Sequence, residues 1–233
     1  MTGLDEERLG SGVLVWGFFS IAGVVVFVGA VLFLPAGVEW SNAWVFLSVF
    51  SLQMILATLY LWRANPAVFV ARRRIHPGTE SWDKVLLVLL LPSFAAMFVV
   101  AGLDRRLHWS FVPVWAIILG YVLFTVGMIG SAWAEAVNRF AEPGVRIQTE
   151  RGHTVIETGP YALVRHPLYV AGEILSFGIA LALGSYWALL PVAAATLLIV
   201  IRTALEDRVL HEGLAGYREY ASRVRYRLIP GVW

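Results

Sequence analysis

The sequence predicts an all-α, polytopic membrane protein with about six transmembrane helices. Hydrophobic residues make up 59% of the 233-residue chain and charged residues only 15%, whereas soluble domains carry about 45–50% apolar and about 25% charged residues. The apolar residues form long runs separated by shorter polar segments. This composition excludes a typical soluble domain and a disordered chain. The absence of cysteine excludes disulfides, thiolate metal sites and thiol catalysis.

The apolar runs have the length that a membrane-spanning helix needs, which is about 20 residues. Four of them are expected to span the bilayer once each: Val13–Leu34, Ala43–Trp62, Val85–Leu103 and Val112–Trp133. The last run, Leu168–Ala204, is too long for one span, and Gly184-Ser185 divides it into a tight hairpin of two antiparallel helices. The first helix of the hairpin, Leu168–Leu183, is short for a full span.

The basic residues are distributed very unevenly between the two sides of this arrangement. Sixteen of the eighteen Lys and Arg residues fall on the side that holds both termini, and only Arg105 and Arg106 fall on the other. The positive-inside rule then places both termini in the cytoplasm. Met1–Leu9 has no basic region or small-residue cleavage site, so we expect no cleavable signal peptide. The cytoplasmic polar mass is the loop 134–167 and the tail 206–233.

The densest polar cluster lies where the hairpin begins. Pro167 suits the first position of a helix because its missing N–H is not needed there. Arg165 and His166 then stand at a helix N-terminus, where free N–H groups and the helix dipole favour an anion such as a ligand carboxylate or phosphate. Alternatively, Arg165 extends to lipid headgroups and His166 only caps the helix.

Three ionisable residues of the hairpin are also candidates. Glu173 lies within the fifth apolar helix, where ionisable groups are costly and often functional; alternatively its carboxylate returns to the membrane surface. Arg202 and Glu206 are four residues apart on the sixth helix, so they can pair and bind a zwitterionic amino-acid group. Alternatively, Arg202 is a plain cytoplasmic anchor.

The remaining candidates are aromatic residues and polar loop residues. Tyrosines near the membrane surface are typical of an aromatic belt, but they could also form the walls of an aromatic ligand's pocket. The loop adds Asn138, Arg151 and His153, of which a neutral histidine could accept a proton near pH 7. No metal-ligand spacing and no phosphate-binding loop occur, and no polar domain is present to bind nucleic acid.

Taken together, residues 155–233 resemble the membrane methyltransferases related to isoprenylcysteine carboxyl methyltransferase and the phospholipid N-methyltransferases. The motifs that carry the resemblance are Gly159-Pro160-Tyr161, Arg165-His166-Pro167-x-Tyr169, the tight hairpin, Arg202-x-x-x-Glu206-Asp207, Gly216-Tyr217-x-x-Tyr220 and Tyr226-Arg227-Leu228-Ile229-Pro230. The chain departs from the family where Asp207 replaces a common Glu, and where Ala171 replaces a common Gly.

The resemblance implies S-adenosylmethionine as cofactor, bound on the cytoplasmic face between the hairpin and the C-terminal tail. It implies that His166, with Arg165 and Pro167, holds the amino-acid end of the cofactor. It also implies that Glu206 contacts the cofactor or orients Arg202, and that Arg202 lies toward the acceptor. The pocket would be lined by Tyr161, Tyr169, Tyr217 and Tyr220. Residues 1–133 would then be four N-terminal spans, and residues 134–233 the catalytic region.

The methyl acceptor is expected to be lipophilic and to reach the site from the bilayer. A carboxylate would be oriented by Arg202, whereas an amine or a thiol would need a proton acceptor such as Glu206 or His153. The candidate substrate residues are Asn138, Arg151, His153 and Glu173. The loop stretch 145–153 suggests a prokaryotic branch, and the sequence gives no indication of oligomeric state.

Two other functions are compatible with the residues. One is a sterol-reductase-like, NADPH-dependent membrane enzyme, because those enzymes have a related C-terminal fold. The other is a non-enzymatic membrane protein that binds anionic lipid through basic clusters such as Arg72-Arg73-Arg74.

Overall fold

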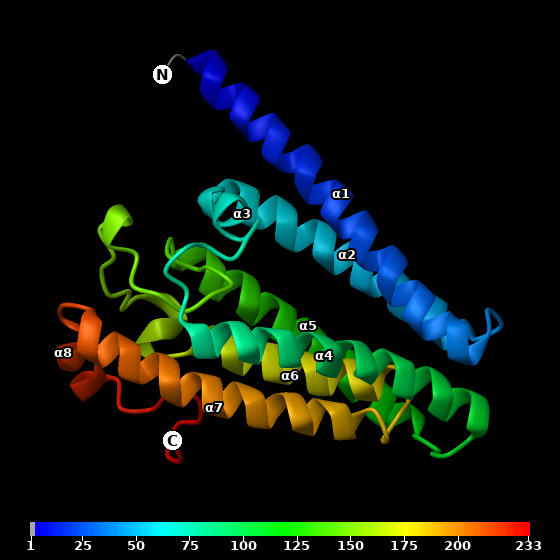
Figure 1. Ribbon diagram of the computed structural model, residues 1–233. Coiled ribbons are helices and arrows are strands. Elements are labelled where there is room, and N and C mark those ends of the chain that lie inside the picture. Colours follow the sequence, from blue (N-terminus) through cyan, green and yellow to red (C-terminus); the bar gives the residue numbers. More distant parts are fainter. Residues whose placement is uncertain (1–2) are drawn as a thin grey trace.

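The protein is a bundle of long helices, seen in a computed structural model that describes the backbone of residues 3–233 and the side chains of residue 12 and residues 14–233 (Figure 1). The regular structure of this described part is entirely helical, as predicted. The helices are α1 (Gly3–Ala36), α2 (Ser41–Ala64), α3 (Ala67–Ala71), α4 (Ser81–Leu107), α5 (Val114–Val137), α6 (Pro167–Ala182), α7 (Leu189–Gly213) and α8 (Tyr217–Arg223), with 3-10 turns η1 (Thr149–Arg151) and η2 (Gly159–Ala162).

Five of these helices are long and apolar enough to cross a membrane: α1 from Leu14 onward, α2, α4, α5 and α7. The remaining apolar helix, α6, has 16 residues and therefore extends about 24 Å, less than the hydrocarbon thickness of about 30 Å. The structure thus supports five candidate spans with α6 beside them, and the predicted sixth full span is not confirmed. The side chains of Met1–Leu9, which bear on the signal-peptide expectation, lie outside those described.

Helix α6 is packed directly against the backbone of α5. A Cβ atom added at Gly120 would lie 2.2 Å from the Ala182 nitrogen, and one added at Gly178 would lie 2.3 Å from the Phe124 nitrogen. A Cβ atom added at Gly127 would lie 2.5 Å from the Leu175 nitrogen. Small residues allow membrane helices to approach this closely. The contact fixes the start of α6 beside the end of α5, where the polar candidates lie.

The predicted hairpin between α6 and α7 is confirmed. Its turn contains Gly184 with φ +75°, a left-handed conformation that glycine adopts without strain. Ser185 accepts a hydrogen bond from the Ala188 N–H at 3.0 Å and donates one to the Asp104 carboxylate at 2.5 Å. The hairpin turn is therefore fastened to the end of α4.

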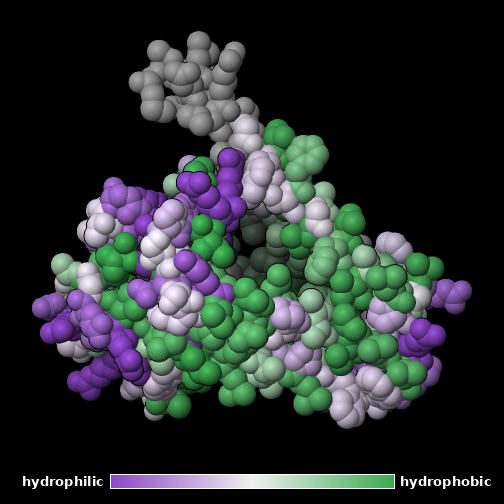
Figure 2. Space-filling view, viewed as in Figure 1, coloured by the Kyte–Doolittle hydropathy of each residue, from purple (hydrophilic) through white to green (hydrophobic). Residues whose placement is uncertain are grey.

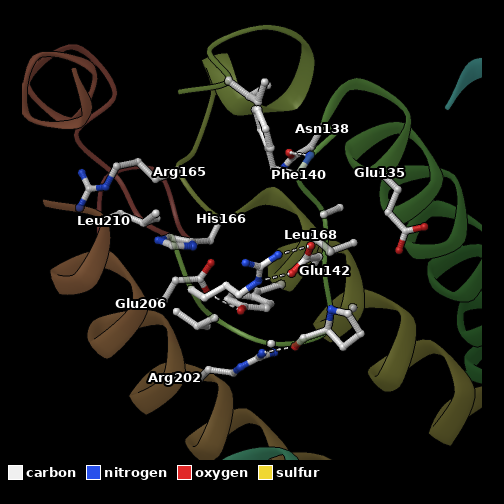
Figure 3. Close-up of a pocket in the computed structure, with 18 of the residues that line it drawn as sticks. Glu135, Asn138, Phe140, Glu142, Arg165, His166, Leu168, Arg202, Glu206 and Leu210 are labelled. Atoms are coloured by element: carbon white, nitrogen blue, oxygen red, sulfur yellow. Dashed lines mark hydrogen bonds and ion pairs between the residues drawn. The ribbon is translucent and has the colours of Figure 1, made fainter. Parts of the chain in front are cut away.

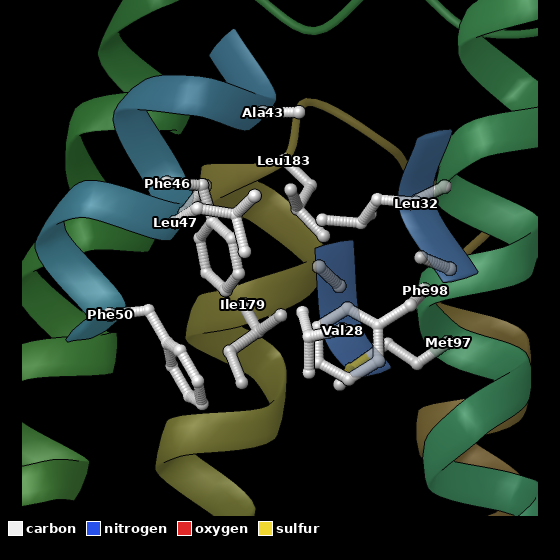
Figure 4. Packing of buried hydrophobic residues seen from close by; sticks show 14 of the residues in the cluster. Val28, Leu32, Ala43, Phe46, Leu47, Phe50, Met97, Phe98, Ile179 and Leu183 are labelled. Carbon is white, nitrogen blue, oxygen red and sulfur yellow. The ribbon is translucent and has the colours of Figure 1, made fainter. Parts of the chain in front are cut away.

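The main apolar core lies between α1, α2, α4, α5 and α6, toward the hairpin end of the bundle. Figure 4 shows Phe46 and Phe50 of α2 facing Ile179 of α6, with Val28 and Met97 beside them. Outside this core, many large apolar side chains remain exposed, including Val88 at 72% and Leu91 at 70%. Figure 2 shows apolar side chains across the middle of the molecule and polar ones toward its ends, as a lipid-embedded bundle requires.

Candidate functional site

A cavity of about 530 Å³ lies between α4, α5, α6 and α7, at the end of the bundle that also carries η1, η2 and α8. Helix α4 supplies an apolar wall, whereas the loop after α5 and the facing ends of α6 and α7 supply polar side chains. The cavity collects eleven of the thirteen residues singled out from the sequence: Asn138, His153, Tyr161, Arg165, His166, Tyr169, Glu173, Arg202, Glu206, Tyr217 and Tyr220.

Pro167 and Arg151 do not line the cavity. Pro167 is the first residue of α6 and is buried, which agrees with its expected role in starting the helix. Arg151 braces the loop from outside, because its guanidinium donates to the Gln148 side chain at 2.7 Å and to the Arg139 carbonyl at 2.6 Å. The Arg151 guanidinium also lies 3.4 Å from the Glu142 carboxylate, so it fixes the loop after α5, which forms part of the cavity wall, without lining the cavity itself.

The Asp207 carboxylate occupies the position where the sequence suggested a ligand anion. It accepts hydrogen bonds from Arg165 Nε at 2.8 Å, from Arg227 Nε at 2.8 Å and from the Tyr217 hydroxyl at 2.8 Å. His166 Nε2 lies 3.4 Å from the same carboxylate. In Figure 3 the Arg165 guanidinium points away from the space that His166, Glu206 and Arg202 surround. The anion that Arg165 meets is therefore the chain's own Asp207.

The segment after α8 is tied to the start of α6 by the same group of residues. The N–H groups of Arg165 and His166 donate to the carbonyls of Tyr226 and Arg227, at 2.9 and 3.0 Å. The Arg165 guanidinium also donates to the carbonyls of Val224 and Arg225. Arg165 thus holds the tail residues 224–227 beside the polar end of the cavity.

Arg202 forms its ion pair with Asp83 of α4 and not with Glu206, the partner that the spacing within α7 had made possible. Its Nε lies 2.7 Å from one Asp83 oxygen, and its terminal nitrogen lies 3.2 Å from the other. The same nitrogen donates to the Pro143 carbonyl at 2.6 Å. A bidentate contact with one carboxylate is stronger for a guanidinium than a single hydrogen bond. The residue spacing within α7 carries no information about a partner on α4.

Glu206 is bound instead by a neutral group. The Tyr169 hydroxyl donates to the Glu206 carboxylate. The Tyr169 ring stacks on His166 with centroids 5.7 Å apart and an interplanar angle of 3°, and the Arg202 guanidinium lies 5.4 Å from its centre. Tyr169 therefore sets the position of Glu206 relative to both His166 and Arg202.

The tyrosines around the polar end support one another. Asn138 donates from its amide to the Tyr161 hydroxyl at 2.8 Å, and the Tyr220 hydroxyl donates to the Tyr161 carbonyl at 2.7 Å. Burial raises the pKa of Tyr161 to about 12 and also raises that of Tyr220. Both groups therefore remain neutral phenols at physiological pH and act as hydrogen-bonding walls.

Burial keeps the His153 side chain a neutral imidazole near pH 7. Its Nδ1 accepts the Gln148 N–H at 3.3 Å, and its ring packs on Phe140 with centroids 4.5 Å apart. Burial lowers the pKa of His153 to about 4. A base with so low a pKa is poorly suited to accept a proton near pH 7, so burial disfavours the proton-acceptor role that the sequence left open for His153.

The arginines that line the cavity all form ion pairs with described side chains, whereas two of its glutamates do not. Each of its four arginines has a carboxylate partner: Arg72 pairs with Glu135, Arg146 with Glu142 and Glu150, Arg165 with Asp207, and Arg202 with Asp83. By contrast, Glu173 is bonded by the Thr196 hydroxyl and Glu206 by the Tyr169 hydroxyl. Among the described side chains, neither of these two glutamates forms an ion pair, although Arg202 interacts with Glu206 electrostatically at longer range.

Sequence reasoning missed two residues that shape the site. Asp83 is fully buried at 0% exposure, and Glu142 lines the cavity while it binds Arg146 and Arg151. An acidic residue at the start of an apolar run was the available signal for Asp83, because a buried carboxylate requires partners. Its partner could not be identified without the packing of α4 on α7.

Two comparisons show similarity between part of this chain and known proteins. Residues 115–215 match the family model "Phospholipid methyltransferase". The chain is also 35% identical over 105 residues to the cobalt-zinc-cadmium resistance protein CzcN of Cupriavidus metallidurans, a match that covers 44% of this chain and 47% of that protein. The chain therefore spans about half the length of this curated relative.

The family match extends beyond the motifs that predicted it. It begins within α5, earlier than residue 155, and it ends before Tyr217. It includes the whole α6–α7 hairpin and the polar loop that precedes it. Residues 115–215 thus have the sequence character of the phospholipid methyltransferase family, which confirms the resemblance drawn from the motifs.

Proposed function

We propose that this protein is an integral membrane methyltransferase that uses S-adenosylmethionine to methylate an amine on a lipophilic acceptor. The observation that carries the proposal is a cavity that joins an apolar wall to two carboxylates, Glu173 and Glu206, which form no ion pair with a described side chain. The family match of residues 115–215 supports the reaction class. We assign the chemistry mainly to residues 134–233, with α4 supplying the acceptor's side of the cavity.

The residues at the polar end fit the cofactor. S-adenosylmethionine would supply a methyl group activated by a positively charged sulfonium, and it also carries an ammonium group. Glu206 offers a carboxylate whose single hydrogen-bond donor among the described side chains is the Tyr169 hydroxyl, so its charge remains available to a cationic ligand. The stacked rings of His166 and Tyr169 offer an aromatic surface beside it. Tyr161, Tyr217 and Tyr220 would complete the walls of the cofactor pocket.

The apolar wall supports access from the bilayer. Leu87, Leu91 and Phe94 line the cavity from α4, one of the candidate spans. Leu91 is 70% exposed, and the neighbouring Val88, which does not line the cavity, is 72% exposed, so the cavity wall continues into the exposed apolar surface of α4. A hydrocarbon chain could therefore remain in an apolar environment while its polar head reaches the glutamates.

The charge pattern favours an amine over a carboxylate as acceptor. A carboxylate would need a free cation, but every arginine that lines the cavity already binds an acidic side chain of the described chain. Glu173 faces the cavity from α6, and its hydrogen-bond partner within the described part of the chain is the Thr196 hydroxyl. It would bind an ammonium head and accept its proton, which leaves a neutral nitrogen able to attack a methyl group.

The active site would face the cytoplasm. The cavity lies at the end of the bundle that carries Arg72, Arg146, Arg165 and Arg202, whereas Arg105 and Arg106 close α4 at the other end. The excess of basic residues at the cavity end supports a cytoplasmic orientation. It also gives the donor, a soluble metabolite, direct access to the polar side.

Methyl transfer to matched acceptors tests the proposal. Purified protein in detergent would be given S-adenosylmethionine with a labelled methyl group and one of three acceptors of equal chain length: an alkyl amine, a fatty acid or an alkyl thiol. We expect label in the amine, and we expect Glu173→Gln to reduce that transfer at least about tenfold. Label in the fatty acid alone would overturn the amine assignment, and label in none would count against the reaction.

A further inference from the structure

Asp83 is a buried carboxylate at the end of α4 that lies next to the cavity. It is 0% exposed, and its two oxygens bind Arg202 at 2.7 and 3.2 Å. One oxygen also accepts the Val145 N–H at 2.7 Å. Asp83 does not itself line the cavity, so its effect on a ligand must pass through the residues that it holds.

Arg202 has two carboxylates within its range. Glu206 lies one helical turn further along α7 and interacts electrostatically with Arg202, and residues four apart on a helix commonly pair. The structure nevertheless directs Arg202 to Asp83 and to the Pro143 carbonyl. Because Arg202 is only 8% exposed, its charge needs a partner and would take another carboxylate if Asp83 became neutral.

Such a change of partner would affect Glu206, the residue that binds the cationic part of the cofactor in the proposed function. A guanidinium bound to Glu206 would neutralise the charge that attracts the ligand and would occupy its oxygens. We propose that Asp83 is a positioning residue that holds Arg202 away from Glu206 and thereby keeps Glu206 available for cofactor binding. This inference rests on the proposed function, since it concerns the same site.

Asp83 also links this pair to the wall of the cavity. The Glu80 N–H donates to the Val145 carbonyl at 3.0 Å, so both backbone groups of Val145 are bound by the start of α4. Arg202 adds the bond to Pro143 from α7. A purely structural role for Asp83 is therefore the competing explanation, and the experiment must separate the two.

Binding of S-adenosylhomocysteine to the purified full chain, measured by calorimetry, separates them with four proteins. Asp83→Asn should weaken binding at least about tenfold, because Arg202 then turns to Glu206. The double variant Asp83→Asn/Arg202→Met removes both charges, so Glu206 is free again and binding should return to near the wild-type value. Asp104→Asn is the matched control, because Asp104 is a buried α4 carboxylate that binds serines at the other end of the helix.

Wild-type affinity in Asp83→Asn would overturn the inference. Weak binding in both Asp83→Asn and the double variant, with normal binding in Asp104→Asn, would also overturn it, because the defect would then be structural. If Asp83→Asn fails to fold, the double variant decides, since removal of both charges leaves no uncompensated ion. No binding by the wild-type protein would instead contradict the proposed function itself.

Discussion

The guanidinium of Arg165 is bound on two nitrogens by the carboxylate of Asp207, at 2.8 and 3.0 Å, with both side chains buried. This pair joins the N-terminus of α6 to α7, and the Arg165 guanidinium extends the connection to the backbone of residues 224 and 225. The polar end of the cavity is therefore held together by ionic contacts rather than by apolar packing alone.

Replacement of Asp207 by Asn should strongly destabilise the cavity end. The variant would leave Arg165 buried without an anion and would release Arg227, and loss of one partner of a buried ion pair costs about 3–5 kcal/mol. Thermal unfolding in detergent would measure the loss, and limited trypsin digestion should cut at Arg225 or Arg227 sooner than in the wild type. Exposed Glu219, replaced by Gln, serves as the control, and equal stability of the two variants would contradict the account.

The close contact of α5 and α6 makes a direct prediction about glycine. Gly127→Leu should prevent folding, because even a Cβ atom there would lie 2.5 Å from the Leu175 nitrogen. Gly172→Ala should be tolerated, because a Cβ atom at Gly172 meets nothing within 4 Å. The yield of monodisperse protein in detergent would compare the two. A well-folded Gly127→Leu protein would show that the helices are further apart.

The buried His153 should make stability depend on pH in the acidic range. The pKa of His153 is lowered to about 4 in the folded chain, against about 6.5 in an unfolded chain. Its unfolded form binds the proton more tightly, so the contribution to stability is present above pH 6.5 and is lost as the pH falls toward 4. Unfolding temperatures of the wild type and His153→Gln, compared from pH 7 to pH 4, should diverge. Parallel curves would argue against the buried neutral imidazole.

The apolar wall predicts a difference between two neighbouring positions of α4. Leu91 lines the cavity and Val88 does not, although both are about equally exposed at 70% and 72%. Leu91→Asn should raise the KM for a long-chain acceptor about tenfold, because it loses apolar contact with the chain, while S-adenosylhomocysteine affinity stays unchanged. Val88→Asn should change neither. Equal effects at both positions would mean that the acceptor does not approach along this wall.

Much of the fold could be predicted because long apolar runs mark the helices that can span a membrane. The four N-terminal apolar runs correspond to α1, α2, α4 and α5, and the turn predicted at Gly184-Ser185 is present. The sixth full span is not confirmed, because α6 is limited by Pro167 at its start and by this turn at its end. The short length of this helix was visible in the sequence, because Pro167 and Gly184 bound the apolar run on both sides.

The candidate site could be located from the sequence, but its pairings could not be predicted. The motif residues around His166 and Glu206 lie on facing helices of one hairpin, so the short turn between α6 and α7 brings them together. The partners of Arg165 and Arg202 depend on how each helix is rotated and on which neighbour it meets. Asp83 is 119 residues from Arg202 in the chain, and spacing along one helix carries no information about such a contact.

Calorimetric titration with S-adenosylhomocysteine tests the central claim, a cofactor site that depends on the free carboxylate of Glu206. We predict that the wild-type protein binds S-adenosylhomocysteine and that Glu206→Gln weakens this binding at least about tenfold. Glu219→Gln, a change of the same kind on the exposed face of α8, should bind as the wild type does. Absence of binding by the wild type, together with binding of NADPH, would contradict the account and favour a reductase.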